Sequence, residues 1–296
     1  MQLSSISLAI TRLGRTADPD AAIKALFASG EQGAWYDPSD LTTMFQDSTG
    51  TIPVTADGQP VGLILDKSQG LTLGPELIVN NDFSTNTWWT PANANASISG
   101  GVLNINSDGT YTGASKYSLL TVGTTYKVSA DIVIISGTRG IFIGDTAVGY
   151  QRETTGAMSF TFGATGTTLE IKRGNGVGGL VATVDNVFCK KLFGNHASQA
   201  TAAKRPLYKV TGLCKRNDFD AVDDVLNTTF PSSLGANCTV ARGNVGAAPT
   251  ILTGQTIGTS YANSTDHCGL IIVNRALTGQ ETADLTAWLT AKGATS

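Results

Sequence analysis

The sequence predicts a mostly β protein built from antiparallel strands in a sandwich or jelly roll, with a few short helices. Glycine is abundant at 34 residues, whereas charged residues make up only 15% of the chain. Short strands joined by tight turns use residues in this way, because Gly and Asn tolerate positive φ and Thr suits a pleated surface. Runs of roughly four to seven residues with β character also recur between residues 77 and 192, separated by turns such as "SGG", "SDG" and "GTRG".

The N-terminal part is expected to contain one strand and two helices. Alternating apolar residues between positions 3 and 10 predict the strand. The stretch "DPDAAIKALFASG" predicts a helix of about ten residues that begins at the N-cap Asp18 and ends at Gly30. The stretch "WYDPSDLTTMFQD" repeats this pattern with Asp37 as the cap, and we interpret Asp37 and Asp40 as caps and not as catalytic carboxylates.

Two further segments carry local structural signals. In "TIPVTADGQPVGLIL", two short strands are predicted on either side of the turn at Asp57 and Gly58. Near the C-terminus, residues 270 to 273 predict a buried strand followed by a helix. A capping box of Thr278 and Glu281 should start that helix, and Gly293 should end it. An apolar stripe should face the core and contains Leu285, Trp288 and Leu289.

One motif of the sequence is split into two distant halves. "LDKS" at 65–68 and "GNHASQAT" at 194–201 resemble parts of a segment that is continuous in laminin-G-like, or concanavalin-type, domains. The stretches "WYDPSD", "DFDAVDDVL" and "GLIIVNRALTGQETADL" are similar to the same family. The resemblance implies that residues 1–71 and 194–296 form one laminin-G-like base. Residues 72–193 would then be a domain inserted into a surface loop of that base, where insertions are tolerated.

The inserted segment resembles a second family. Its start, "ELIVNNDFSTNTWW", and its end, "ATVDNVFCKKL", are similar to the boundaries of jelly-roll carbohydrate-binding modules. Members of that family often hold a structural calcium ion between these ends, which makes Asp82 and Asp185 the calcium candidates. Ser84 stands where the family has Glu, and this departure counts against calcium. No other cofactor is expected.

Aromatic side chains of the insert are the candidate glycan contacts, because sugars pack their C–H faces on aromatic rings. The candidates are Trp88, Trp89, Tyr111, Tyr117 and Tyr126. Adjacent side chains of an extended chain point to opposite faces, so one of the two tryptophans should be buried and the other partly exposed. The exposed one would serve as a glycan platform or, alternatively, cover the junction between the two domains.

The densest group of carboxylates consists of Asp218, Asp220, Asp223 and Asp224. Glycoside hydrolysis needs two carboxyl groups on opposite sides of a sugar bond, and this group could supply them. We prefer the interpretation that it forms a polar turn before a strand, since no second catalytic feature accompanies it. A Ser-His-Asp set is not credible with two histidines, and the Gly-rich stretch "RGNGVGG" precedes a strand and not the helix that a phosphate loop requires.

Composition excludes several classes of protein. The net charge of −3 and the isoelectric point near 5.4 argue against a nucleic-acid-binding surface. No apolar run approaches the roughly 20 residues needed to span a bilayer, and "MQLSSISLAITRLGR" lacks the basic start of a secretory signal. The four cysteines are far apart, so we interpret them as unpaired, with a disulfide or metal site as the alternative; they are Cys189, Cys214, Cys238 and Cys268.

The whole arrangement resembles proteins of tailed bacteriophages and prophages. The resemblance implies a non-enzymatic virion protein, such as a tail fibre or related appendage, made in the host cytoplasm and able to contact a host-surface glycan. The alternatives are a capsid decoration or head-fibre protein without a ligand, and a polysaccharide depolymerase that uses the acidic group.

The laminin-G-like base is expected to be trimmed. Only about 38 residues separate Phe230 from Cys268, and a full sandwich would need several more strands there. Exposed strand edges tend to be covered, so we expect a homo-oligomer, most simply a trimer, or attachment to other virion proteins. Cys268 and Gly269 stand where the family commonly has acidic residues, which lowers the expectation of calcium in the base.

Overall fold

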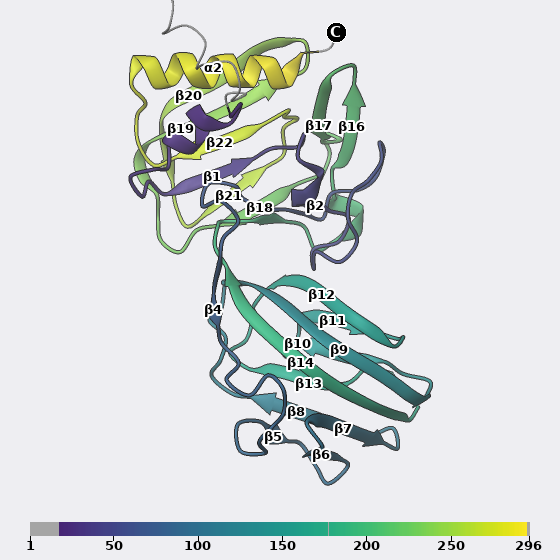
Figure 1. Cartoon of the computed structure of the whole chain (residues 1–296). Coiled ribbons are helices and arrows are strands. Elements are labelled where there is room, and N and C mark those ends of the chain that lie inside the picture. The colour runs from purple at the N-terminus through teal and green to yellow at the C-terminus, as the bar shows by residue number, and fades with distance from the viewer. Residues whose placement is uncertain (1–17, 177, 295–296) are drawn as a thin grey trace, which may run out of the picture.

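The computed structural model describes residues 18–176 and 178–294, and the strand predicted at positions 3–10 lies outside this range. The fold is mostly β with antiparallel sheets, as the sequence predicts. Figure 1 shows two sandwiches, one above the other, joined beside β4 (Leu73–Glu76). We call the upper sandwich, formed by the first and last parts of the chain, the outer domain, and the lower one the insert.

The outer domain pairs a four-stranded sheet with a five-stranded sheet. The first sheet has the order β1 (Gly33–Tyr36), β22 (Leu270–Val273), β19 (Gly235–Asn244) and β20 (Ala247–Ile257). The second has the order β2 (Met44–Phe45), β3 (Leu63–Ile64), β15 (Ala197–Ser198), β18 (Leu226–Thr229) and β21 (Ser260–Asn263). A separate hairpin consists of β16 (Leu207–Thr211) and β17 (Cys214–Asp218). Three of these strands, β19 to β21, lie between Phe230 and Cys268.

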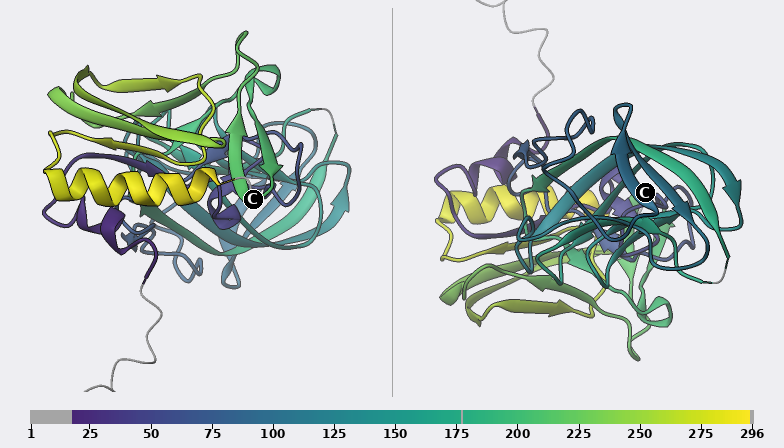
Figure 2. Two further views of the ribbon diagram at one scale, coloured as in Figure 1. Left: turned by 90° about the horizontal axis from the view of Figure 1, so that it is seen from above. Right: turned by 90° about the horizontal axis from the view of Figure 1, so that it is seen from below.

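The central strand β22 is buried on both faces, which explains its unbroken apolar sequence. Leu270 and Ile272 point into the core between the two sheets. Ile271 and Val273 point the other way, toward the helices α1 (Ala21–Ala25) and α2 (Gly279–Gly293). Figure 2 shows α2 lying along this outer face of the sheet.

The insert is a sandwich of two sheets. One has the order β12 (Gly156–Gly163), β9 (Thr125–Gly137), β14 (Leu180–Leu192), β7 (Val102–Ser107) and β6 (Ala96–Ser99), and β4 also pairs with β14. The other has the order β11 (Gly149–Arg152), β10 (Ile141–Gly144), β13 (Leu169–Arg173), β8 (Gly113–Lys116) and β5 (Thr90–Pro91). A single apolar core fills the space between them, with Leu103, Val128, Ile143 and Phe160 fully buried.

The two halves of the split motif meet in space. Strands β3 and β15 are paired, with Ile64 opposite Ala197. The buried carboxylate of Asp66 accepts hydrogen bonds from the backbone N–H groups of Trp35 at 2.8 Å and Asn195 at 2.7 Å. The N–H of Phe193 donates to the carbonyl of Thr72 at 3.0 Å, so the chain leaves and re-enters the outer domain at one place.

The C-terminal predictions are confirmed. The strand spans the expected residues, and the helix that follows begins with the capping box of Thr278 and Glu281. The Arg275 guanidinium and the backbone at Thr278 lower the pKa of Glu281 to about 2. Leu285, Trp288 and Leu289 are buried, and the helix ends at Gly293 as predicted. These signals are local, which explains why they could be found in the sequence.

The predicted N-terminal helices are wrong in length and capping. The first, α1, has its N-cap at Asp20, and Asp18 instead accepts a hydrogen bond from the Asp20 N–H at 2.9 Å. The second is one 3-10 turn, η1 (Leu41–Thr43), capped by Asp40 and not by Asp37. The buried Asp37 carboxylate instead accepts the N–H of Ser39 at 3.0 Å and binds Lys292 of α2 at 2.8 Å. A second 3-10 turn, η2 (Ala202–Lys204), precedes β16.

The predicted strand pair around Asp57 and Gly58 is also wrong. The turn exists, with Gly58 at φ 81°, but the segments on its two sides pair with other parts of the chain. Pro53 bridges to Phe45, and Pro60 bridges to Leu207.

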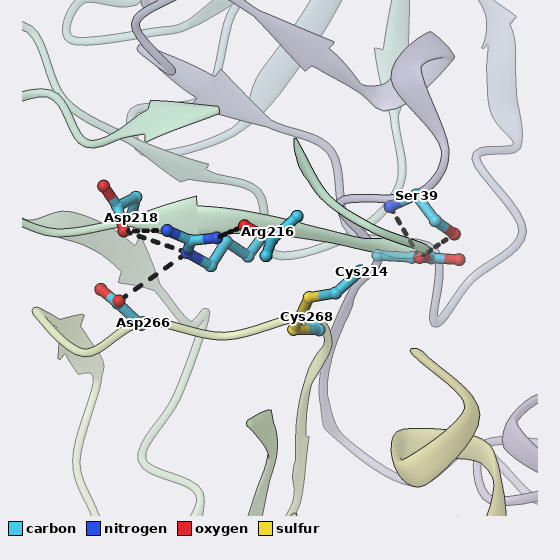
Figure 3. Close-up of a disulfide and its surroundings, with 8 residues drawn as sticks. Ser39, Cys214, Arg216, Asp218, Asp266 and Cys268 are labelled. Atoms are coloured by element: carbon cyan, nitrogen blue, oxygen red, sulfur yellow. Dashed lines mark hydrogen bonds and ion pairs between the residues drawn. A yellow bond between two sulfur atoms is a disulfide. The ribbon is translucent and has the colours of Figure 1, made fainter. Parts of the chain in front are cut away.

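Two of the four cysteines form a disulfide, which corrects the interpretation that all four are unpaired. Cys214 of β17 is bonded to Cys268, with a Cα–Cα distance of 6.3 Å (Figure 3). Cys189 and Cys238 are free and buried. The bond ties the hairpin of β16 and β17 to the segment just before β22. Beside it, Arg216 lies between Asp218 at 2.9 Å and Asp266 at 4.0 Å.

Within the described residues, no helix is long and apolar enough to span a membrane.

Candidate functional site

The outward face of the insert sheet that contains β10, β13 and β8 carries the best candidate site. Side chains alternate along these strands, so Ile143 and Ile171 enter the core. Phe142 on β10 pairs in register with Lys172 on β13, and Glu170 on β13 pairs with Ser115 on β8. These partners therefore share the opposite face of the sheet.

Four side chains meet on this face, and we call them the Tyr111 cluster: Tyr111, Phe142, Glu170 and Lys172. Lys172 Nζ lies 2.5 Å from Glu170 Oε2, and the Tyr111 hydroxyl lies 3.2 Å from Glu170 Oε1. Lys172 Nζ also lies 5.4 Å from the centre of the Tyr111 ring and 4.9 Å from that of Phe142. The ammonium group is thus held by one carboxylate and two rings.

The cluster combines a buried polar pair with an exposed ring. The side chains of Lys172 and Glu170 are only 12% and 11% exposed, although they lie on the outer face of a sheet. Tyr111 is 46% exposed, and the neighbouring Tyr117 is 61% exposed. Partial burial, with the Glu170 carboxylate and Tyr117 nearby, raises the pKa of Tyr111. A ring that is held in place and still accessible is suited to stacking against a ligand.

The donors and acceptors of the cluster match the chemistry of a sugar. Glu170 offers a carboxylate acceptor, Lys172 an ammonium donor, and Tyr111 a hydroxyl beside a ring face. Binding sites for small polar ligands combine aromatic surface with a few fixed polar groups in this manner. Glu170, Lys172 and Phe142 were not among the sequence candidates. The only signal was the alternation of polar and apolar residues in "LEIKR", which any half-exposed strand shows.

One tryptophan is buried and the other partly exposed, as predicted, but alternation is not the reason: residues 86–89 form bends, and both rings pack against the core of the insert with their centres 4.9 Å apart. Trp89 is buried, stacks on Phe83 at 5.6 Å, and donates its ring N–H to the carbonyl of Asn80 at 3.1 Å. Trp88 is partly exposed, and Lys116 Nζ lies 4.5 Å from its ring centre. The strand that follows them, β5, lies at the end of the insert away from the outer domain (Figure 1), and Trp88 packs against the core of the insert.

Tyr126 is a wrong candidate. It is 3% exposed, its ring packs 6.1 Å from that of Phe162, and its hydroxyl accepts the Thr121 N–H at 2.8 Å. Every second residue of β9 points into the core, and Tyr126 belongs to this set together with Val128 and Ala130. Among the five aromatic candidates, Trp88, Tyr111 and Tyr117 offer accessible surface.

The acidic group after β17 is organised as a turn. One carboxylate oxygen of Asp220 accepts the backbone N–H groups of Val222, Asp223 and Asp224 at 2.9 to 3.1 Å. Asp218 is paired with Arg216 at 2.9 Å. Burial raises the pKa of Asp224, whose carboxylate accepts the Asp220 N–H. These bonds give the carboxylates a structural role in the turn that precedes β18.

Metal-ligating side chains approach one another at one place within the described residues. Oxygens of Asp220, Asp223 and Asp224 lie within 4.8 Å of each other. Asp82 is exposed and accepts the Ser84 N–H at 3.1 Å. Asp185 is half-buried on β14 opposite Asp131. Neither calcium candidate belongs to a group of three acidic, His or Cys side chains in this part of the chain.

Both histidines are buried and serve as hydrogen-bond partners. His196 Nδ1 accepts the Asp66 N–H at 2.9 Å, and His267 is enclosed by Asn217 and Asn263. Burial lowers the pKa of each to about 4, so both rings are neutral near pH 7.

Comparisons with known proteins give one distant structural similarity, which carries no argument about this chain. Neither a protein-family model nor a curated protein sequence matches the chain. Among solved structures, the chain is similar to the N-terminal CBM22-1-CBM22-2 tandem domain of Xyn10C from Paenibacillus barcinonensis, at 10% sequence identity and a TM-score of 0.29. The match covers 72% of this chain and 95% of that chain. At this level of similarity the match carries no argument about function.

Proposed function

We propose that the protein is a non-enzymatic structural protein of a tailed-phage virion, a tail fibre or related appendage, that binds a host-surface glycan through the Tyr111 cluster. The observation that carries the binding proposal is the exposed Tyr111 ring fixed beside the paired Glu170 and Lys172 on an open sheet face. Tyr117 follows β8, lies close enough to Tyr111 to affect its pKa, and adds accessible aromatic surface.

The arrangement favours binding over cleavage. Glycoside hydrolysis needs two carboxyl groups on opposite sides of the scissile bond, one of them able to donate a proton. The cluster holds one carboxylate, and Lys172 is bonded to it at 2.5 Å. The acidic group of the outer domain is engaged with backbone N–H groups and with Arg216.

Two features support a virion setting. The disulfide between Cys214 and Cys268 suits a protein that acts outside the cell, because disulfides persist in oxidising surroundings such as a virion surface. Each sheet of the outer domain also ends in unpaired strands, with β20 at an edge of one and β21 at an edge of the other. Such edges favour contact with other subunits or other virion proteins, and we propose a homotrimer.

Incubation with purified surface polysaccharide of the host tests the proposal. The protein should be retained by the immobilised polysaccharide, and no reducing ends should be released. Release of reducing ends that is lost on Asp224→Asn would support the depolymerase instead. If the protein is not retained and no reducing ends are released, the result would support a decoration or head-fibre protein without a ligand. Labelling virions with an antibody against this chain would show whether it lies on the tail or the head.

A further inference from the structure

A cavity in the outer domain is lined by residues of β19, β20 and β21. It opens on the side of the sandwich where the edge strands β20 and β21 follow one another in the chain, and its volume is about 270 Å³. Val240 and Leu252 form an apolar side, and Gln255, Ser260, Tyr261 and Arg242 supply polar groups. At roughly 30 Å³ per water molecule, the space equals about nine waters, which is more than an isolated ion needs.

Arg242 points into this space with its charge uncompensated. On β19, Cys238 and Val240 face the core between the sheets. Arg242 lies two residues further along the strand, so its side chain is on the same face, nearer the open side of the sandwich. One terminal nitrogen of its guanidinium donates to the Tyr261 hydroxyl. Its Nε is buried without a hydrogen-bond partner, and none of the ion pairs in the described part of the chain includes it. The other charged or titratable neighbour is the buried His267, which is neutral.

Arg242 is partly buried and has no counter-charge, and a carboxylate is the group that best offsets such a cation. Guanidinium presents a planar fork of N–H donors that matches the two oxygens of a carboxylate. Here the terminal nitrogens would supply the fork, since within the described residues Nη1 donates to no group and Nη2 donates only to Tyr261. The neighbouring hydroxyl and amide groups of Ser260 and Gln255 suit the hydroxyls of the same ligand.

A backbone irregularity shapes the cavity. Leu252 pairs with Val240, and Gln255 pairs with Cys238. Between these two pairs, β20 has two residues where β19 has one. The extra residue makes a bulge in which Gly254 has φ 67°, a conformation that favours glycine. Bulges redirect side chains and occur often beside functional sites.

We propose that this cavity binds a small carboxylate ligand of the size of one acidic sugar, held by Arg242 and oriented by Tyr261. The site is separate from the Tyr111 cluster, and the inference does not depend on the proposed function. A carboxylate could come from a free acidic sugar or from an acidic side chain of a second copy. We assign the site to the free sugar, because the polar side chains that line the cavity (Arg242, Gln255, Ser260 and Tyr261) exceed what one acidic side chain would use.

Calorimetric titration of the full chain with glucuronate tests the proposal, with glucose and inorganic phosphate as comparison ligands. Glucuronate should bind saturably and more weakly as salt is raised, and glucose should not bind. Arg242→Met should weaken glucuronate binding by about 10- to 100-fold, the value of a charge-assisted hydrogen bond. Arg216→Met is the matched control, since Arg216 is paired with Asp218 in the same domain, and it should leave binding unchanged.

A stability measurement separates binding from folding. Arg242→Met removes a partly buried charge that no carboxylate pairs, so the urea midpoint without ligand should stay the same or rise. Phosphate binding without glucuronate binding, equal binding of glucose, or no saturable binding would each overturn the proposal. Self-association that is lost in Arg242→Met but kept in Arg216→Met, without glucuronate binding, would place a second copy in the cavity and would also overturn it.

Discussion

Removal of the Cys214–Cys268 disulfide should destabilise the outer domain by about 4 kcal/mol. The bond closes a loop across a sequence separation of 54 residues. In the chain-entropy model, a cross-link of this length restricts the unfolded chain by roughly 14 cal/mol/K, which is ~4 kcal/mol at 25 °C. Both cysteines are fully buried, so replacing both by Ala in Cys214→Ala/Cys268→Ala keeps the site apolar.

Hydrogen exchange measured by mass spectrometry across a urea series provides the assay, because it follows each domain separately. Peptides from β22 should lose protection at lower urea in the double variant, while peptides from β9 of the insert should not change. Cys238→Ala is the matched control. It removes a free buried sulfur from the same core and should cost about 1 kcal/mol.

The reasoning is refuted if the double variant is destabilised no more than this control. It is also refuted if alkylation of the unreduced, denatured protein labels all four cysteines. The structure predicts that only Cys189 and Cys238 are labelled under those conditions.

Three further predictions concern other parts of the molecule. Replacing residues 72–193 by a short Gly linker should leave a folded outer domain, because Thr72 and Phe193 are hydrogen-bonded neighbours; loss of its cooperative unfolding would contradict the nested arrangement. Trp89→Ala should lower the free energy of unfolding by roughly 3–5 kcal/mol in a urea titration. Trp88→Ala should lower it clearly less, because Trp88 is partly exposed. The pKa of the buried His267 is lowered to about 4, below its unfolded value near 6.5, so its contribution to stability is complete above pH 6.5 and lost as the pH falls toward 4. His267→Gln should therefore flatten the acid side of the stability profile by about 3 kcal/mol, and an unchanged slope would show that the ring is not buried in neutral form.

Local signals in the sequence were sufficient where neighbouring residues decide the structure. The capping box of Thr278 and Glu281 and the apolar run from 270 to 273 are complete within a few residues. The prediction at Asp37 missed a distant contact, since its buried carboxylate is bound by Lys292, which lies 255 positions along the chain. The disulfide could not be foreseen from spacing, since its partners meet only when β17 lies beside the segment before β22.

The candidate site shows the same limit. Exposed Tyr111 could be named from its residue type, but the burial of Glu170 and Lys172 depends on rings from two other segments that cover them. Tyr126 could have been excluded, because it shares the period-two pattern of Val128 and Ala130 along β9. The cavity at Arg242 had no signal, since it arises where two edge strands end the sandwich.

The most direct test of the central claim is calorimetric titration of host-surface polysaccharide into a double variant, Tyr111→Ala with Tyr117→Ala. Phe188→Ala is the matched control, because Phe188 is a partly exposed aromatic residue on the other sheet of the insert. The double variant should lose affinity by about tenfold or more, equivalent to ~1.4 kcal/mol of ring contact, while the control stays within about twofold of the wild type. Equal affinity of all three proteins for the polysaccharide, or an equal loss in both variants, would contradict glycan binding at the Tyr111 cluster.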